Sequence, residues 1–255
     1  MTDGVTLTVS DGIASVTLDG PGGNRLSWRT MTALRDIASE LEPRDDVRAV
    51  LLRGAGRDFS RGADLTDADL AERMRTDDGR PVARAGRELL DAWSALPQPT
   101  VVALRGWVVG GGLGLALACD LRVAAADARL ALPEVDRAMH LGWGIVPRLV
   151  AAFGSHTASW LALTGDPVSA NELRAGGLRL EGDPIGAAQA VARDLASKPP
   201  LAVRAIKATL REARDVAMPA ADADVERFAA TVVSHDFGEA IAAFFEKRVP
   251  RYDGR

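Results

Sequence analysis

The stretch Gly106-Trp107-Val108-Val109-Gly110-Gly111-Gly112-Leu113-Gly114 decides the fold of this chain. The apolar run from Thr100 to Leu104 precedes it and predicts a short buried strand, whereas the Ala/Leu-rich run from Leu115 to Ala118 predicts a helix. The glycines therefore lie where a strand leads into a helix N-terminus, whose first N–H groups have no partner within the helix. Those donors suit a phosphate or a developing oxyanion, although a purely structural turn is an open alternative.

A second glycine-bearing turn lies earlier in the chain. The apolar segment 47–53 predicts a buried strand, and the turn of residues 54–65 follows it directly. Two such turns at the carboxyl ends of two strands are the usual way in which an open α/β sheet builds a ligand crevice. The polar segment 66–81 comes next and predicts a flap or a short helix, with a solvated surface loop as the alternative.

One carboxylate stands in apolar surroundings. Glu134 follows Pro133 and lies between Leu132 and Val135. Burial there would raise the pKa of its carboxyl group toward neutrality, as a general base requires. The alternative is a glutamate in the first turn of a helix after a proline, where it would favour the helix dipole.

Composition bounds the classes of protein that fit. The chain has 255 residues, 47% of them hydrophobic and 26% charged, with a net charge of −4, which is typical of one large α/β domain. The basic residues are scattered, which disfavours nucleic acid as a partner. The sequence has no membrane-length apolar run and no signal pattern, and its one cysteine, Cys119, excludes an internal disulfide. We therefore expect a cytoplasmic protein without a membrane partner.

The remaining periodicities alternate strand and helix at first and are nearly all helical in the last third. Residues 5–18 predict a β-hairpin that turns at Asp11-Gly12, and residues 19–24 a loop. Ser27 is the predicted N-cap of a helix that ends near Leu41. Further helices are predicted at 82–96, 145–153, 158–163, 169–175, 186–195, 201–213, 220–233 and 237–245, and a further strand at 121–124.

Several motifs in register resemble those of the crotonase (enoyl-CoA hydratase/isomerase) superfamily, in order and spacing from about residue 5 to 255. The segment 59–65, Phe-Ser-Arg-Gly-Ala-Asp-Leu, resembles the F-x-x-G-A-D-[IL] turn of that family. The stretch from Gln98 to Gly112 is similar to its strand–glycine signature. Further likenesses are Ala118-Cys119-Asp120-Leu121-Arg122, Leu132-Pro133-Glu134-Val135, Leu163-Thr164-Gly165-Asp166 and Phe245-Glu246-Lys247-Arg248-Val249-Pro250.

The resemblance implies an α/β fold, a spiral of repeated ββα units whose C-terminal helices trimerise, often as a dimer of trimers. Residues 1–195 would form the core that binds and turns over a coenzyme A thioester. Residues 196–255 would form the helical region that trimerises and closes the pocket. Coenzyme A would enter as part of the substrate, and neither a permanently bound cofactor nor a metal is expected.

The resemblance also implies site residues. The backbone N–H groups of Arg61 and Gly111 would form an oxyanion hole for the thioester oxygen, where charge develops during enolate formation. Residues expected to bind the substrate are Asn24, Arg25, Ser60, Gly62, Ala63, Asp64, Leu65, Trp107, Gly110, Gly112, Pro133, Leu141, Gly142 and Trp143.

The acid/base positions depart from the hydratase pattern. Hydratases resembling this chain carry two carboxylates, and here the second is Glu134 whereas the first falls at Gly114. The helper aspartate of dienoyl isomerases falls at Gly142. One base suffices to move a double bond from the 3- to the 2-position, so a single-base Δ3,Δ2-enoyl-CoA isomerase is the leading hypothesis. A hydratase, another enolate chemistry (carbon–carbon bond formation or decarboxylation) and a non-catalytic acyl-CoA binder are the alternatives.

Five further residues keep two interpretations each. His140 is either a replacement acid/base or a polar neighbour of the pocket. Trp143 either fills the core or enters the acyl pocket, where it would favour a short or flat acyl group. Arg25 and the pair Lys247-Arg248 either meet nucleotide phosphates or carry solvated surface charge.

Overall fold

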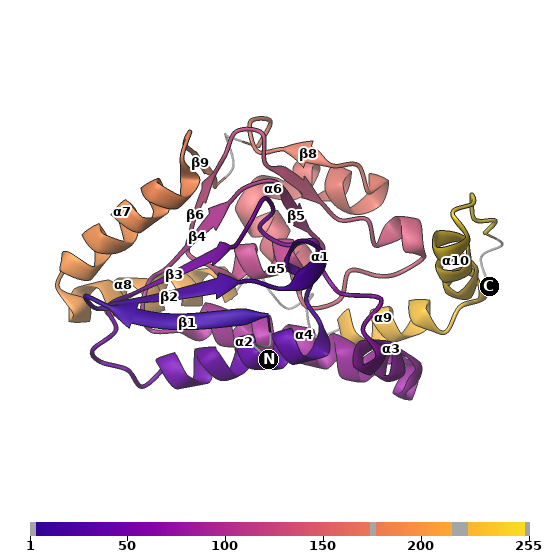
Figure 1. The fold of residues 1–255 in the computed structure, drawn as a ribbon, viewed down its shortest axis with the longest axis horizontal. Coiled ribbons are helices and arrows are strands. Elements are labelled where there is room, and N and C mark those ends of the chain that lie inside the picture. Colours follow the sequence, from indigo (N-terminus) through magenta and orange to yellow (C-terminus); the bar gives the residue numbers. More distant parts are fainter. Residues whose placement is uncertain (1–3, 174–176, 216–223, 253–255) are drawn as a thin grey trace.

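The computed structural model describes residues 4–173, 177–215 and 224–252, and its strands form two sheets (Figure 1). The larger sheet has six strands in the order β1-β2-β3-β4-β6-β9, and the smaller has three in the order β5-β7-β8. The strands are β1 (Val5–Ser10), β2 (Ile13–Leu18), β3 (Ala49–Gly54), β4 (Thr100–Leu104), β5 (Trp107–Val109), β6 (Leu121–Ala124), β7 (Arg129–Ala131), β8 (Val168–Ser169) and β9 (Arg179–Leu180).

The larger sheet begins with the predicted hairpin and continues in parallel. β1 and β2 pair antiparallel around Asp11-Gly12, both with positive φ, and β2, β3, β4, β6 and β9 then pair in parallel. Every residue of β4 is buried, as expected for a parallel strand that is covered on both faces. Both glycine turns consequently follow strands that run in the same direction as their neighbours.

The smaller sheet brings the central glycines beside the predicted base. β5 pairs in parallel with β7, so that Val109 lies opposite Ala131. The N–H of Gly110 then donates to the carbonyl of Ala131 at 3.0 Å. Glu134 comes three residues after Ala131, so the register of this short pair places it next to the glycine turn.

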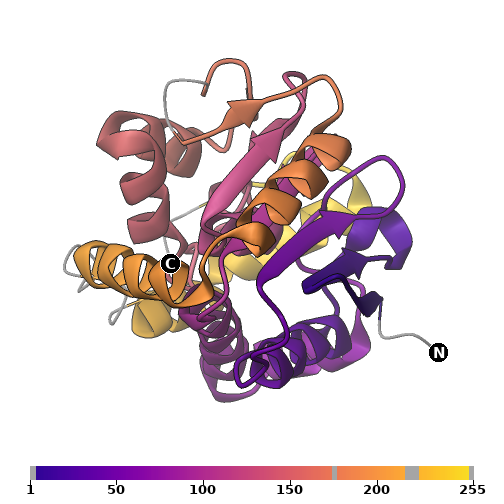
Figure 2. The same cartoon turned by 90° about the vertical axis from the view of Figure 1, so that its left-hand side faces the viewer.

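Helices cover both faces of the larger sheet (Figures 1 and 2). The main core lies under α2, α4, α5 and α6, and a second cluster lies between α7 and the other face of β3, β4 and β6. The helical segments are α1 (Pro21–Asn24), α2 (Trp28–Leu41), α3 (Ala68–Arg75), η1 (Asp77–Gly79), α4 (Arg80–Ala95), α5 (Gly111–Ala118), η2 (Val135–Arg137), α6 (Ile145–Thr164), α7 (Pro184–Ser197), α8 (Pro200–Asp215), α9 (Asp224–Val232) and α10 (His235–Glu246).

The helix that starts at the central glycines is wholly buried. Gly110 precedes α5 with φ 52° and ψ −122°, a conformation that glycine tolerates and residues with a Cβ do not. All eight residues of α5 are buried, so this helix brings its N-terminus into the interior. Ser27 caps α2 as predicted, because its Oγ accepts from the N–H of Thr30 at 3.1 Å.

Two sequence predictions are corrected by the structure. Residues 169–173 are not helical. Ser169 of β8 pairs with Arg129 of β7, and the carboxylate of Glu172 accepts from the Ser169 N–H at 2.9 Å. Residues 174–176 lie outside the described residues. The two helices predicted at 145–153 and 158–163 are confirmed as the two parts of α6, which is interrupted where Gly154 adopts φ 79° and ψ 163°. The loop predicted at 19–24 contains the short turn α1.

The segment 66–81 is a helix with a structural role. It forms α3 and the turn η1, and it continues into α4. Leu70 of α3 is only 1% exposed, so the apolar side of this polar segment faces the interior. Of the two sequence interpretations, the short helix is confirmed.

The C-terminal third is helical, as predicted. α9 and α10 lie near α3 and α4 on the side of the molecule away from α7 (Figure 1). Residues 220–223 of the helix predicted at 220–233 lie outside the described residues. Among the residues that the structure describes, no helix has the length and apolar character that crossing a membrane requires.

Candidate active site

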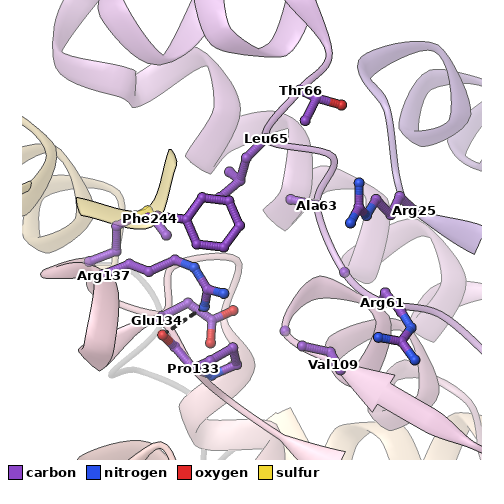
Figure 3. Close-up of a pocket in the computed structure, with 13 residues that line it drawn as sticks. Arg25, Arg61, Ala63, Leu65, Thr66, Val109, Pro133, Glu134, Arg137 and Phe244 are labelled. Carbon is purple, nitrogen blue, oxygen red and sulfur yellow. Dashed lines mark hydrogen bonds between the residues drawn. The ribbon is translucent and has the colours of Figure 1, made fainter. Parts of the chain in front are cut away.

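Two adjoining cavities open at the carboxyl ends of β3, β5 and β7. The outer cavity, of about 630 Å³, has Arg25 and Arg61 on one side and Arg137 on the opposite side (Figure 3). Its remaining lining residues are Gly62, Ala63, Leu65, Thr66, Val109, Gly110, Pro133, Glu134, Met139 and Phe244. The arginines make this cavity suited to an anionic ligand.

The inner cavity, of about 430 Å³, is almost wholly apolar. It shares Ala63, Leu65, Glu134 and Met139 with the outer cavity. The other residues around it are Leu70, Met74, Val82, Gly111, Leu141, Trp143, Ile145 and Phe228. Glu134 therefore lies at the junction of a polar and an apolar cavity.

One oxygen of the Glu134 carboxyl group has no partner among the described residues. Its Oε2 is buried and has no hydrogen-bond partner among the described residues, although the residue as a whole is half-buried. Burial raises the pKa of Glu134 to about 7, opposed by a backbone hydrogen bond and by the charge of Arg137. A carboxylate with such a pKa can both accept and return a proton near neutral pH.

Glu134 has no second acid beside it. Of the described residues that line the two cavities, it is the one carboxylate. A Cβ at Gly114 would lie 2.9 Å from side-chain atoms of Ile145 and Leu90, so that position is closed by apolar packing. Gly142 has φ 54° and faces Phe228, so a side chain there would be strained. In the structure, other side chains therefore pack against both glycine positions at which the sequence lacks a helper acid.

The structure corrects one of the two predicted oxyanion donors. The N–H of Arg61 already donates to the carbonyl of Gly23 at 3.0 Å and is not available to a substrate. Leu26 forms backbone hydrogen bonds with the two residues that flank Ala63. The N–H of Leu26 donates to Gly62 O at 2.8 Å, and the carbonyl of Leu26 accepts from the N–H of Asp64 at 3.0 Å. The N–H of Ala63 consequently points away from Leu26 and has no partner among the described residues.

The other predicted donor is available. The first hydrogen bond of α5 runs from the N–H of Gly114 to Gly110 O at 3.0 Å, and the N–H of Gly110 donates to Ala131 O. The N–H of Gly111, in the first turn, has no partner among the described residues. Because Ala63 and Gly111 both line the inner cavity next to Glu134, two backbone donors and one base surround the same space.

Two predicted binding residues are structural instead. Asn24 is 4% exposed, and its amide donates to the carbonyls of Ala55, Asp58 and Phe59 at 2.9, 2.9 and 3.2 Å. Ser60 is fully buried, and its Oγ donates to Asn24 O at 2.8 Å. Neither residue lines a cavity, because both hold the glycine turn after β3 in its shape.

Replacing Asn24 by alanine is expected to destabilise the fold. The change would leave three carbonyl groups without their donor and would place alanine at φ 59°. We expect the free energy of unfolding to fall by about 2–4 kcal/mol. Urea denaturation followed by circular dichroism would measure it, and a loss below about 0.5 kcal/mol would contradict this role for the amide.

The other predicted residues divide between the cavities and their surroundings. Arg25, Gly62, Ala63, Leu65, Gly110 and Pro133 line the outer cavity, and Leu141 and Trp143 line the inner one. Asp64, Trp107, Gly112 and Gly142 line neither. Trp107 instead supports a lining residue, since the Arg61 guanidinium lies 5.6 Å from its ring centroid.

His140 belongs to the support of the site and does not line either cavity. Its Nδ1 accepts from the N–H of Gly142 at 3.1 Å, and its own N–H donates to Thr231 Oγ1 at 3.0 Å. Burial lowers its pKa, and the charge of Asp224 opposes that shift. Its ring is thereby committed to shaping the loop between Glu134 and Trp143, which favours the polar-neighbour interpretation.

Several lining residues were not singled out from the sequence, although the region 196–255 was expected to close the pocket. Phe244 of α10 stacks on Arg137, whose guanidinium lies 5.4 Å from the ring centroid and donates to Pro133 O at 3.0 Å (Figure 3). Leu70 and Met74 come from α3, and Phe228 from α9. Helical periodicity marked Phe228 and Phe244 as apolar, but it gave no signal for which cavity they would meet.

The basic pair near the C-terminus is not at the cavities. Arg248 is engaged by the carboxylate of Glu239, at 2.5 and 2.8 Å. Neither Lys247 nor Arg248 lines the outer cavity, whereas Arg25 does. Among the described residues, no cluster of three or more metal-ligating side chains is present.

Comparisons with known proteins agree with this geometry. The family model described as enoyl-CoA hydratase/isomerase matches residues 8–255. The chain is 33% identical to the 2,3-dehydroadipyl-CoA hydratase of Escherichia coli, over 87% of this chain and 88% of that protein. It is 30% identical to the short-chain-enoyl-CoA hydratase of Clostridium acetobutylicum, over 92% of each.

Solved structures show the same fold. The crystal structure of an enoyl-CoA hydratase from Mycobacterium avium subsp. paratuberculosis matches with a TM-score of 0.87 at 28% identity, over 98% of both chains. The α/β architecture with C-terminal helices that the sequence predicts is thereby confirmed.

Proposed function

The chain belongs to the enoyl-CoA hydratase/isomerase family, and from this membership we propose that it isomerises 3-enoyl-CoA thioesters to 2-enoyl-CoA with Glu134 as its single acid/base. The observation that carries the proposal is that Glu134 is the one carboxylate among the described residues around the two cavities, with position 114 closed by Ile145 and Leu90. An acyl-CoA thioester as the substrate is consistent with the family.

The proposed reaction needs no group beyond this site. The ionised Glu134 removes a proton from C2 of the 3-enoyl thioester, and the electron pair moves to the thioester oxygen as a dienolate. The protonated Glu134 then returns the proton at C4, and the double bond remains between C2 and C3. The same carboxyl group serves both transfers because its pKa of about 7 permits either protonation state.

Two backbone donors would stabilise the dienolate oxygen. The free N–H groups of Ala63 and Gly111, which both line the inner cavity, are the proposed oxyanion hole. Fixed donors of this kind stabilise charge that develops only in the transition state, and each typically contributes about 3–4 kcal/mol. Arg25 and Arg61 at the outer cavity would meet the phosphates of coenzyme A, which enters as part of the substrate.

Hydration is the second candidate, because the named relatives are hydratases. It requires that a water be activated and that a proton be delivered to the α-carbon. With one carboxylate, both tasks would fall to Glu134 through a cyclic relay, and the apolar inner cavity offers no second side chain to hold that water.

A paired assay on the purified protein distinguishes the two. Trans-3-enoyl-CoA and trans-2-enoyl-CoA of matched chain length would be offered separately, and product formation would be followed chromatographically. We expect isomerisation of the first and little hydration of the second. Brisk hydration with slow isomerisation would overturn the proposal in favour of the hydratase.

The pH dependence of the isomerisation is expected to report Glu134. The base form is required, and burial has raised its pKa to about 7. We therefore expect kcat/KM to be low at pH 5.5 and to increase with pH until it levels off above about pH 8. An initial-rate profile from pH 5 to 9 measures it, and a curve that is flat between pH 6 and 8 would be inconsistent with Glu134 as the base.

Assembly and location extend the proposal. α8 exposes Leu201, Ile206 and Leu210, at 80%, 62% and 66% exposed, which supports the proposed trimer or dimer of trimers through the region 196–255. A cytoplasmic location is proposed from the single cysteine of the sequence.

A further inference from the structure

The indole ring of Trp143 lines the inner cavity and packs directly against two helix positions where only glycine leaves room for it. A Cβ at Gly86 of α4, or at Gly111 of α5, would collide with the indole ring of Trp143. Trp143 is 5% exposed, so the ring fills the space between these two helices. Gly86, Gly111 and Trp143 therefore pack together and form one wall of the inner cavity.

The backbone of Trp143 is fixed in an unfavourable conformation by buried charged groups. Trp143 has φ 56°, which is uncommon for a residue with a bulky side chain. The guanidinium of Arg148, 4% exposed, donates to the carbonyls of Trp143 and Gly144 at 3.4 and 3.0 Å and to Asp91 of α4 at 2.6 Å. On the other side, the N–H of Gly144 donates to the buried Asp224 at 3.0 Å. A strained backbone that several hydrogen bonds hold in place, next to a reactive carboxylate, points to a functional position.

Among the described residues, the rest of the inner cavity is lined by uncharged side chains. Leu70, Val82 and Phe228 form its far side and are 1%, 3% and 5% exposed. Glu134 is the one ionisable side chain among the described residues around it. Among the described residues, a long acyl chain would meet these buried side chains, and a carboxylate at the end of the acyl group would meet no cation.

We propose that Trp143 is the specificity-determining residue of the inner cavity, and that its indole, seated between Gly86 and Gly111, restricts the acyl group to a short, uncharged hydrocarbon chain. This inference rests on the proposed function, because it assigns the inner cavity to the acyl group of the thioester. It also separates this chain from its relative named for a dehydroadipyl thioester, whose acyl group ends in a carboxylate.

Binding of saturated thioesters tests the proposal without any reaction. Isothermal titration calorimetry would measure the Kd of butyryl-, hexanoyl-, octanoyl-, decanoyl- and adipyl-CoA for the wild type and for Trp143→Ala. Each methylene that is newly buried contributes about a fourfold gain in affinity. We expect the wild-type gain to stop by hexanoyl-CoA and adipyl-CoA to bind at least about tenfold more weakly than hexanoyl-CoA. In Trp143→Ala the gain should continue, so that octanoyl-CoA binds at least about tenfold more tightly than it does to the wild type.

A second variant approaches the same contact from α4. Gly86→Ala places a methyl group against the indole, although alanine is the better helix former. We expect it to push the ring into the cavity and to weaken butyryl-CoA binding about tenfold, and the added Trp143→Ala change to restore the affinity. Gly238→Ala is the matched control, because this helical glycine of α10 has open space around its Cβ position. The control should leave every Kd unchanged.

The outcomes separate this inference from the proposed function. If wild type and Trp143→Ala show one chain-length profile, and Gly86→Ala binds as the wild type does, the inference is wrong while the isomerase proposal stands. Tight binding of adipyl-CoA would likewise overturn it. If the chain-length profile shifts as expected but 3-enoyl-CoA is not isomerised, the inference stands and the proposed reaction fails.

Discussion

Glu134→Gln is expected to lower kcat for the isomerisation by about 10²- to 10⁴-fold, the range that a general acid–base group contributes. Glutamine has the size of the glutamate but can neither take the C2 proton nor return it at C4. Because no second carboxylate lines the cavities among the described residues, nothing else can assume the role. Initial rates with a saturating 3-enoyl thioester would measure the loss.

The stability of the same variant serves as its control. Glu134 has a folded-state pKa of about 7, above its ordinary value of 4.5, so the folded state binds the proton more tightly than the unfolded state. Its contribution to the stability therefore falls as the pH increases from about 4.5 to 7. At pH 8 Glu134→Gln should be more stable than the wild type, by about 3 kcal/mol. A variant that is inactive and also less stable at pH 8 would contradict the description of Glu134 as a buried carboxyl group whose Oε2 has no partner.

Gly110→Ala is expected to cause the second-largest loss. The new Cβ would lie 2.5 Å from Glu134 Oε1, so the carboxylate must move away from the substrate. A misplacement of about 1 Å commonly costs about 10²-fold in rate. The positive φ of 52° adds backbone strain of about 1–3 kcal/mol, which lowers the stability.

A matched glycine separates these two effects. Gly56 also has a positive φ, of 67°, but a Cβ there meets nothing within 4 Å. Gly56→Ala should thus lose a comparable amount of stability in urea denaturation and keep its kcat. If both variants lose activity equally, the strain and not the contact with Glu134 is responsible, and the argument from Gly110 fails.

Local patterns were enough to predict much of the fold. The alternation of Val5, Leu7 and Val9 before Asp11-Gly12 predicts the hairpin, and the apolar run from Thr100 predicts a parallel strand that is buried throughout. The segment 169–173 was mispredicted as a helix because the pairing of Ser169 with β7 is a long-range contact that local periodicity does not report. The inner side of α3 was missed for the same reason, since Leu70 stands alone in a charged segment.

The candidate site was predicted in part. Glu134 and the free N–H of Gly111 follow from their positions in the sequence, because a helix N-terminus leaves donors unpaired whatever surrounds it. Whether the N–H of Arg61 is free cannot be predicted in this way, because it donates to the carbonyl of Gly23, in a turn that is distant in sequence. Asn24 looked like a ligand-binding residue in a glycine loop, but its three carbonyl partners make it part of the scaffold.

The sequence by itself determined the family, the two glycine turns and the single carboxylate, because these depend on residue type and spacing along the chain. The tertiary structure alone decided which N–H groups are free, which groups surround Glu134 and where Trp143 lies. Each of those properties depends on groups that are distant in sequence: Gly23 beside Arg61, the apolar walls around Glu134, and Gly86 beneath the indole. Burial and hydrogen-bond competition arise only when such segments pack together, so no local pattern encodes them.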